Sequence, residues 1–245
     1  MEQESDVRVP QRPSPLSHYF KEVIYGGIDG IVTTFAVVAG FSGAALSGDS
    51  TVQLSFLVVL LFGLANLFAD AASMGLGNFL SVRSEKDLYF AARETETRVI
   101  QTNPEREISA TIAIMEAKGF SRTDAETLAH IYKQNEEYWV DFMMQHRLET
   151  ADPRGENEIF TGLATFFSFM VFGAIPLLPF MVAFTDDASI TFVYSAVGTF
   201  IALVLLGLLK WRVIGARFTA SLAEVVLVGG TAAVLAYFVG SFFSL

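Results

Sequence analysis

The stretch Leu60–Glu85, LLFGLANLFADAASMGLGNFLSVRSE, decides the fold of this chain. Within its mainly apolar helix, four side chains stand at intervals of four residues and are here called the stripe: Asn66, Asp70, Met74 and Asn78. In a helix, this spacing places all four on one face. A carboxylate at membrane depth costs about 2.5–3.5 kcal/mol, so it is expected to have a partner, a water-filled cavity or an ion. Met74 adds a thioether, a soft donor that suits transition metals. The stripe predicts a metal path; the alternative is a carboxylate bonded to a neighbouring helix, with Met74 filling the core.

Composition places the chain among membrane proteins. Of its 245 residues 52% are hydrophobic and only 17% are charged, and the mean hydropathy is +0.47. These values are typical of a polytopic membrane protein. The absence of cysteine excludes disulfides and thiolate metal sites, and a net charge of −10 argues against a nucleic-acid partner. No phosphate loop, HExxH motif or Ser/His/Asp arrangement is present, so we do not expect an enzyme.

The expected fold is an all-α polytopic membrane protein with five transmembrane helices and a cytosolic helical domain between the second and the third. About 20 apolar residues cross a bilayer, which predicts spans at 23–46, 52–80, 158–184, 189–209 and 219–243. The domain organisation follows from these spans. We expect a disordered tail (1–17), two membrane segments (18–80 and 158–245) and an acidic domain (81–157).

Basic residues predict the orientation. They flank three of the span ends: Arg8, Arg12 and Lys21; Arg83 and Lys86; and Lys210, Arg212 and Arg217. The loops SGDSTVQ and FTDDAS contain neither Lys nor Arg. The positive-inside rule therefore places the N-terminus in the cytosol. Pro176 and Pro179 predict a kink or break near the far end of the third span.

The second helix is expected to continue past the membrane, because neither Gly nor Pro interrupts residues 78–103. Beyond it, residues 81–158 contain 16 acidic and 10 basic side chains. Helix signals at Asn103-Pro104, Gly119 and Ser121 with Asp124 predict three helices, at 81–102, 104–118 and 122–148. Candidate metal ligands in this segment are Glu94, Glu96, Glu105, Glu107, Glu116, Glu136, Glu137, Met143, Met144, His146 and Glu149. For any single glutamate, a place on a solvated face is the commoner role.

Two further features lie in the membrane segments. The first span, YGGIDGIVTTFAVVAGFSGAAL, contains Asp29 and a ridge of small residues at Ala36, Gly40 and Ala44. Such a ridge predicts close helix packing, either between subunits or within one chain. Glu224, near the cytosolic edge of the fifth span, is a candidate proton carrier or second ligand, or a side chain that snorkels to the interface.

Five segments in this order resemble the vacuolar iron transporter family: GGIDGIVTTFAVVAG, ANLFADAASMGLGNFLSVRSE, DFMMQHRLE, GAIPLLP and ASLAEVVLVGG. The resemblance covers nearly the whole chain after about residue 17. It implies five spans, a homodimer with a path at its two-fold axis, and export of Fe²⁺ from the cytosol in exchange for protons. The matching positions are Asp29 and Met74 for the path, and Glu96, Glu107, Met143 and Met144 for a cytosolic metal-binding domain.

The chain also departs from that family's pattern. Asn78 stands where the family usually has Glu, and Val99, Ala110 and Arg147 stand at positions resembling its other cytosolic glutamates. Three alternatives follow for the cytosolic metal site: it is weakened, it is rebuilt from Glu94, His146 or Glu149, or it is absent.

The sequence leaves two classes of function open. The first is a proton-coupled exporter of Fe²⁺, with Mn²⁺, Co²⁺ or Zn²⁺ as alternative cargo, because metal and proton compete for one carboxylate. The second is a membrane-anchored metal sensor or buffer without transport. Buried carboxylates favour the transporter, since an anchor does not need them. An intramembrane hydrolase has no supporting motif. The expected partners are a second copy of the chain and membrane lipid, and the bacterial cytoplasmic membrane is favoured over a vacuolar one.

Overall fold

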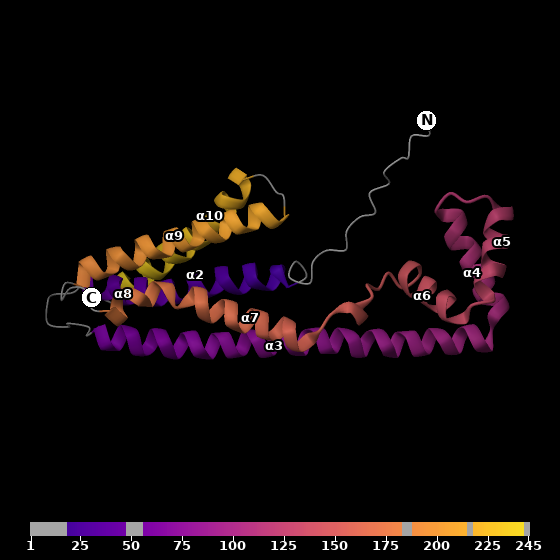
Figure 1. The fold of residues 1–245 in the computed structure, drawn as a ribbon, viewed down its shortest axis with the longest axis horizontal. Helices are drawn as coiled ribbons and strands as arrows, with labels where there is room; N and C mark the ends of the chain where they lie inside the picture. The colour runs from indigo at the N-terminus through magenta and orange to yellow at the C-terminus, as the bar shows by residue number, and fades with distance from the viewer. Residues whose placement is uncertain (1–18, 48–55, 183–187, 215–217, 243–245) are drawn as a thin grey trace, which may run out of the picture. The chain divides into compact units, whose positions relative to one another are not determined.

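The computed structural model of the chain describes residues 19–47, 56–182, 188–214 and 218–242 (Figure 1). All regular structure in these ranges is helical. The chain divides into two compact units, here called the membrane unit (Met1–Phe79 and Ile159–Leu245) and the polar unit (Leu80–Glu158). The expected tail at 1–17 and most of the two loops without Lys or Arg fall outside the described residues.

Five helical segments in the described ranges are long and apolar enough to cross a membrane. They are Phe20–Gly43, Leu57–Thr102, Glu158–Val182, Ser189–Val213 and Phe218–Phe242. These segments correspond to α2 (Phe20–Ser47), α3 (Phe56–Thr102), α7 to α8, α9 (Ala188–Ile214) and α10 (Phe218–Phe242). The prediction of five spans in a multi-pass membrane protein is confirmed.

The third span is broken, as its prolines predict. Helix α7 (Glu158–Gly173) ends just before the short 3₁₀ turn η2 (Ile175–Leu177), and α8 (Leu178–Val182) follows. Pro176 has no N–H to continue the helical bonding. Its carbonyl oxygen instead accepts a 2.7 Å hydrogen bond from the Ser195 hydroxyl of α9, so the break is tied to a neighbouring helix.

Helix α3 is one uninterrupted helix of 47 residues. At 1.5 Å per residue it is about 70 Å long, whereas a bilayer's hydrocarbon core is about 30 Å thick. The expected uninterrupted helix is confirmed; it is longer than a bilayer core is thick, and α3 contributes to both units.

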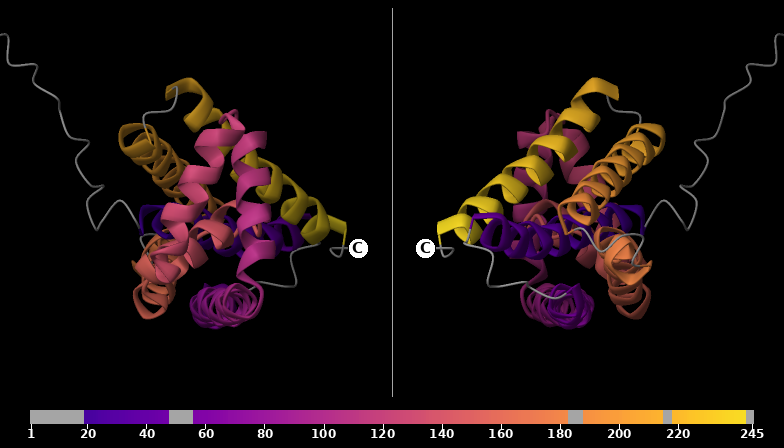
Figure 2. Two further views of the ribbon diagram at one scale, coloured as in Figure 1. Left: turned by 90° about the vertical axis from the view of Figure 1, so that its right-hand side faces the viewer. Right: turned by 90° about the vertical axis from the view of Figure 1, so that its left-hand side faces the viewer.

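In the membrane unit, α2 lies against α9 and α10 (Figures 1 and 2). The approach is close because glycines line it. A Cβ added to Gly43 would lie 2.5 Å from the carbonyl oxygen of Tyr237 on α10. Helix α2 also approaches α7 closely, because a Cβ added to Gly30 would lie 2.5 Å from the carbonyl oxygen of Phe169. Gly40, a member of the predicted small-residue ridge, faces Ala236 of α10 in the same chain. For Gly40 the alternative of packing within one chain therefore holds; the side chain of Ala44 lies outside the described residues.

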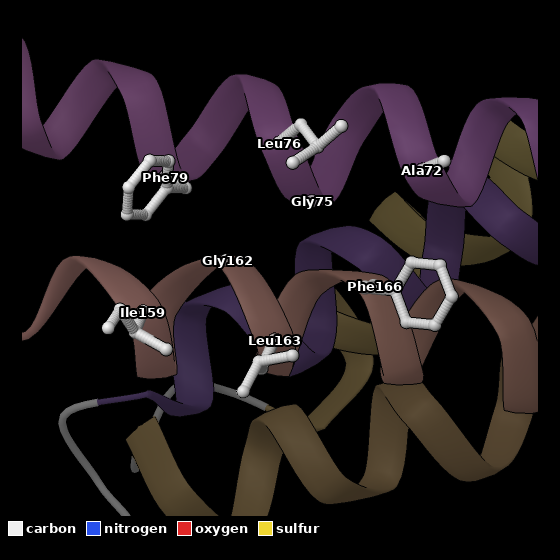
Figure 3. A pocket seen from close by; sticks show the side chains of 8 residues that line it. All are labelled: Ala72, Gly75, Leu76, Phe79, Ile159, Gly162, Leu163 and Phe166. Atoms are coloured by element: carbon white, nitrogen blue, oxygen red, sulfur yellow. The ribbon is translucent and has the colours of Figure 1, made fainter.

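Helices α3 and α7 also meet through glycines. Figure 3 shows Gly75 of α3 and Gly162 of α7 between the two helices. A Cβ at Gly162 would lie 2.7 Å from the carbonyl oxygen of Gly75, so neither position leaves room for a side chain. An apolar groove beside this contact is lined by Ala72, Gly75, Leu76, Phe79, Ile159, Gly162, Leu163 and Phe166.

The polar unit contains α4 (Pro104–Ala117), α5 (Arg122–Lys133), α6 (Glu136–His146) and the 3₁₀ turn η1 (Pro153–Gly155), with the end of α3. The predicted single helix at 122–148 is wrong, because the chain breaks at Gln134 and Asn135. The Asn135 side chain accepts a 3.1 Å hydrogen bond from the Tyr138 backbone N–H and so begins α6.

The other helix signals of the polar unit are confirmed. Pro104 is the first residue of α4. Gly119 has a φ of +98°, and the chain reverses direction there between α4 and α5. The two helices lie side by side (Figure 1). The Ser121 hydroxyl accepts a 3.2 Å hydrogen bond from the Asp124 backbone N–H at the start of α5.

Ion pairs fasten the end of the polar unit to α3. Asp141 of α6 accepts hydrogen bonds from Arg93 of α3 at 3.1 Å and from Arg154 of η1 at 2.9 Å. The Arg154 guanidinium also lies over the Tyr89 ring, and its hydrogen bond holds the pKa of Asp152 below the ordinary value. The segment after α6 is therefore held in a defined place in this unit.

Candidate functional site

The stripe on α3 contains an internal pair. The Asn66 side-chain amide donates a 2.8 Å hydrogen bond to Asp70, one turn further along the helix. Both side chains are half-buried. The hydrogen-bond donor to the Asp70 carboxylate thus lies on α3 itself. The alternative drawn from the sequence was a bond to a neighbouring helix. One carboxylate oxygen accepts this bond, and the carboxylate keeps further lone pairs for a proton or a metal ion.

Asp29 brings a second carboxylate to the same region from α2. It is half-buried, and its backbone oxygen accepts a 2.8 Å hydrogen bond from the Thr33 hydroxyl. Asp70 of α3 is half-buried as well. Two membrane helices, α2 and α3, therefore each carry one half-buried acidic side chain.

Met74 and Asn78 have different surroundings. Met74 is half-buried and packs beside the apolar core that contains Leu67 and Phe169. The Asn78 amide donates a 2.8 Å hydrogen bond to the buried Thr165 hydroxyl of α7. Asn78 therefore joins α3 to α7 by a hydrogen bond, whereas the bond between Asn66 and Asp70 stays within α3.

In the polar unit, two of the predicted ligands meet. Glu96 of α3 and Glu107 of α4 are 3% and 1% exposed. Both carboxylates bind one cation, the guanidinium of Arg147, which lies at the C-terminal end of α6. Arg147 was expected only as a position that had lost a ligand, and the structure places it between the two carboxylates.

Met143 and Met144 are core residues, 0% and 1% exposed. The Met143 sulfur lies 3.5 Å from the Thr111 hydroxyl. That hydroxyl accepts a 2.8 Å hydrogen bond from the Trp139 indole N–H and lies 2.8 Å from the Glu107 backbone oxygen. Trp139, Thr111 and Met143 thus fix the part of α4 that carries Glu107.

The remaining candidates are dispersed. Glu94 forms an exposed ion pair with Arg98 at 3.0 Å, and Glu149 is exposed with a φ of 51°. His146 packs its ring on Phe142. Burial lowers the pKa of the His146 imidazole, and the charge of Lys118 lowers it further. Of the other glutamates, Glu105 pairs with Lys133, Glu136 accepts a hydrogen bond from Gln101, and Glu116 and Glu137 pair more loosely with Arg122 and Arg93.

Glu224 of α10 forms an ion pair with Lys210 of α9 and its side chain is 62% exposed. This partner agrees best with the expectation of a side chain at the interface. Among the residues that the structure describes, no group of three or more His, Asp or Glu side chains is arranged to hold a metal ion.

Sequence reasoning missed two of these relations. The Asn66–Asp70 bond joins residues four apart on one helix, a spacing that favours side-chain contact and could have predicted it. The Arg147 contacts join residues 40 and 51 positions apart. Helical periodicity contains no signal for contacts at that separation.

Comparison with known proteins identifies the family. The model of the VIT family matches residues 20–241, which is most of the chain. This chain belongs to the VIT family. Among its relatives, a protein of Toxoplasma gondii named vacuolar iron transporter is 37% identical over 236 residues, which are 94% of this chain and 76% of the relative.

Two further VIT family relatives come from a plant and a second parasite. Vacuolar iron transporter 1 of Oryza sativa subsp. japonica is 31% identical over 93% of this chain and 86% of its own length. The vacuolar iron transporter of Plasmodium falciparum is 33% identical over 78% of this chain and 69% of its own length. The resemblance found in the sequence motifs is thus confirmed over nearly the whole chain.

Proposed function

We propose that this chain is a secondary transporter that exports Fe²⁺ from the cytosol in exchange for protons. Family membership and the names of the relatives support iron as the cargo and transport, not catalysis, as the activity. One observation supports the mechanism: the apolar helices α2 and α3 each carry a half-buried aspartate, Asp29 and Asp70. A membrane anchor for a sensor or buffer does not need such a pair.

The chemistry follows from competition at these carboxylates. A deprotonated carboxylate binds a divalent cation, and protonation removes that ligand. An inward proton gradient can therefore drive metal outward through the same groups. Met74 supplies a sulfur donor that favours Fe²⁺ over Mg²⁺ and Ca²⁺ and also accepts Mn²⁺, Co²⁺ or Zn²⁺ as competing cargo.

We further propose that two copies of the chain assemble through α3. Four small residues at intervals of four form an exposed ridge on this helix: Ala65, Ala69, Ser73 and Gly77. Each precedes a stripe residue by one position, so the ridge runs beside the stripe. Small residues allow two membrane helices to approach closely. Pairing of two ridges would bring two copies of the stripe to one axis and form a shared path.

In this proposal the polar unit and the N-terminus lie in the cytosol, on the side with the basic residues that flank the spans. The relatives are vacuolar by name. Our expectation for this chain is the cytoplasmic membrane of a bacterium, where the same orientation moves metal out of the cell.

Flux in reconstituted vesicles tests the function. The purified chain is inserted into liposomes with an imposed proton gradient, and Fe²⁺ movement and internal pH are recorded together. We expect metal flux that reverses with the gradient and proton flux that requires metal, with Mn²⁺, Co²⁺ and Zn²⁺ compared as cargo. Metal binding without flux, at the level of protein-free vesicles, would support the sensor or buffer instead.

A further inference from the structure

A buried cluster in the polar unit has a chemistry that the transport proposal does not use. It joins three helices: Glu96 comes from α3, Glu107 from α4 and Arg147 from the end of α6. The two glutamate side chains are 3% and 2% exposed, whereas that of Arg147 is 32% exposed. The two carboxylates therefore lie in the protein interior, and the cation between them reaches the surface.

The two terminal nitrogens of the Arg147 guanidinium bind different carboxylates. Nη1 of Arg147 binds Oε2 of Glu107, and Nη2 binds Oε2 of Glu96. One planar cation with donors at both ends thus bridges two acids. This bridging position between two carboxylates is also the position that a divalent cation takes in carboxylate sites.

The charge of this cluster is incomplete. With both acids ionised, the two carboxylates carry −2 and one guanidinium carries +1, which leaves one negative charge uncompensated within the cluster. The second oxygen of Glu96, Oε1, is buried and has no hydrogen-bond partner. A buried acceptor without a partner is unusual and costly. The pair therefore has a charge and a free oxygen that Arg147 does not satisfy and that a divalent ion would satisfy.

The helix that carries Glu107 is held by contacts other than Arg147. The backbone oxygen of Glu107 lies 2.8 Å from the Thr111 hydroxyl, which in turn accepts the Trp139 indole N–H. Arg147 instead follows the last residue of α6, and the chain turns just after it, at Glu149 with a φ of 51°. The Arg147 side chain is 32% exposed, so the cation is the member of the cluster that contacts solvent.

We propose that Arg147 is the resident cation of the Glu96–Glu107 pair, and that a divalent metal ion binds this pair only in competition with its guanidinium. In the native chain the Glu96–Glu107 pair is thus bridged by the chain's own side chain, and the polar unit folds without metal. Removal of the guanidinium opens a divalent-cation site. This inference does not depend on transport, because it concerns binding in the polar unit alone.

The test measures Mn²⁺ binding by the full chain in detergent, with electron paramagnetic resonance to count the bound ions. Arg147→Gln removes the positive charge and leaves a shorter, neutral polar side chain. We expect this variant to bind one more Mn²⁺ than the native chain, with an affinity at that site raised by about tenfold or more. Adding Glu96→Gln and Glu107→Gln to Arg147→Gln should abolish the extra site.

The chain offers a matched control. Arg154 also bridges two acids, Asp141 and Asp152, but their side chains are 32% and 49% exposed. Water already solvates those carboxylates, so Arg154→Gln should create no Mn²⁺ site. An extra site in Arg154→Gln equal to that in Arg147→Gln would show that any lost arginine suffices, and would overturn the proposal.

Folding is followed by circular dichroism on the same samples. If Arg147→Gln unfolds without metal, Mn²⁺ should restore its helix content and raise its Tm, because the ion replaces the missing cation. A folded Arg147→Gln without an extra Mn²⁺ site would contradict the proposal. So would an unfolded variant that Mn²⁺ fails to restore, or a native chain that already binds Mn²⁺ through Glu96 and Glu107 as tightly as the variant does.

Discussion

At the scale of single residues, the acidic groups of the two units have different kinds of partner. Asp70 of the membrane unit accepts one hydrogen bond from Asn66, a neutral donor. Glu96 and Glu107 of the polar unit bind a positively charged guanidinium. A carboxylate that exchanges protons and metal ions must not be held in a permanent ion pair. A carboxylate with a structural role, in contrast, needs a partner of opposite charge when it is buried.

Asp70→Asn tests whether this carboxylate belongs to the path. The new amide carbonyl can still accept the Asn66 bond, so the fold should survive. We expect metal flux in vesicles to fall strongly, because Asn neither titrates nor carries charge. The control is Asn78→Asp, which changes a residue bonded to Thr165 on another helix and adds an acid. Flux at the native rate in Asp70→Asn would make Asp70 a structural residue.

Met74→Leu tests the sulfur donor. Leucine fills a similar volume, so the packing around this half-buried residue should change little. We expect the affinity for Fe²⁺ to fall by about tenfold, equivalent to about 1.4 kcal/mol, while proton coupling persists. Met170→Leu is the matched control, because Met170 packs against the same apolar core from α7. Equal loss in both variants would assign the effect to packing.

At the scale of helices, close glycine contacts set how the membrane unit packs. Gly240 of α10 is buried, and a Cβ there would collide with the backbone of Gly40 on α2. Gly230, on the same helix, is exposed and has nothing within 4 Å of an added Cβ. The two glycines lie on the same helix but in different environments, so the same Gly→Ala change can be compared at both.

Gly240→Ala should lower the free energy of unfolding by about 1–3 kcal/mol, because the added methyl group forces α2 and α10 apart. Gly230→Ala should be neutral or stabilise by up to about 1 kcal/mol, through helix propensity. Thermal unfolding of both variants in detergent measures the difference. Equal destabilisation would mean that the α2–α10 contact does not depend on close approach at Gly240.

Several features of the helices could be predicted from the sequence, and others could not. The five spans, the break before Pro176 and the long α3 follow from local hydropathy and from where proline and glycine stand, and the structure confirms them. The break at Asn135 was missed, because an N-cap asparagine inside a periodic apolar pattern looks like an ordinary exposed helix position. At the candidate site, residue type alone was enough to predict Glu96 and Glu107 as candidate ligands. Their shared ion pair with Arg147 was not predicted, because it depends on packing between residues far apart in the sequence.

At the scale of the whole molecule, the proposed dimer predicts a pattern of crosslinks. The native chain has no cysteine, so single cysteines report unambiguously. Ala65→Cys, Ala69→Cys and Ser73→Cys lie on the exposed ridge of α3 and should form crosslinks between subunits in the membrane. Leu205→Cys, equally exposed on α9, should not. The residues at 37–41 of α2 are buried or half-buried, so cysteines there should crosslink poorly. Crosslinks through Leu205→Cys alone would place the interface elsewhere.

The central claim is that Asp29 couples metal and protons, and one measurement tests it directly. Asp29→Asn is purified, shown by size exclusion to have the native assembly, and reconstituted beside the native chain. Fe²⁺ flux and internal pH are then recorded under the same proton gradient. The account predicts that native vesicles move both ions in opposite directions and that Asp29→Asn moves neither, since asparagine binds no proton and a metal only weakly. Fe²⁺ flux at the native rate, still driven by the proton gradient in Asp29→Asn, would contradict it.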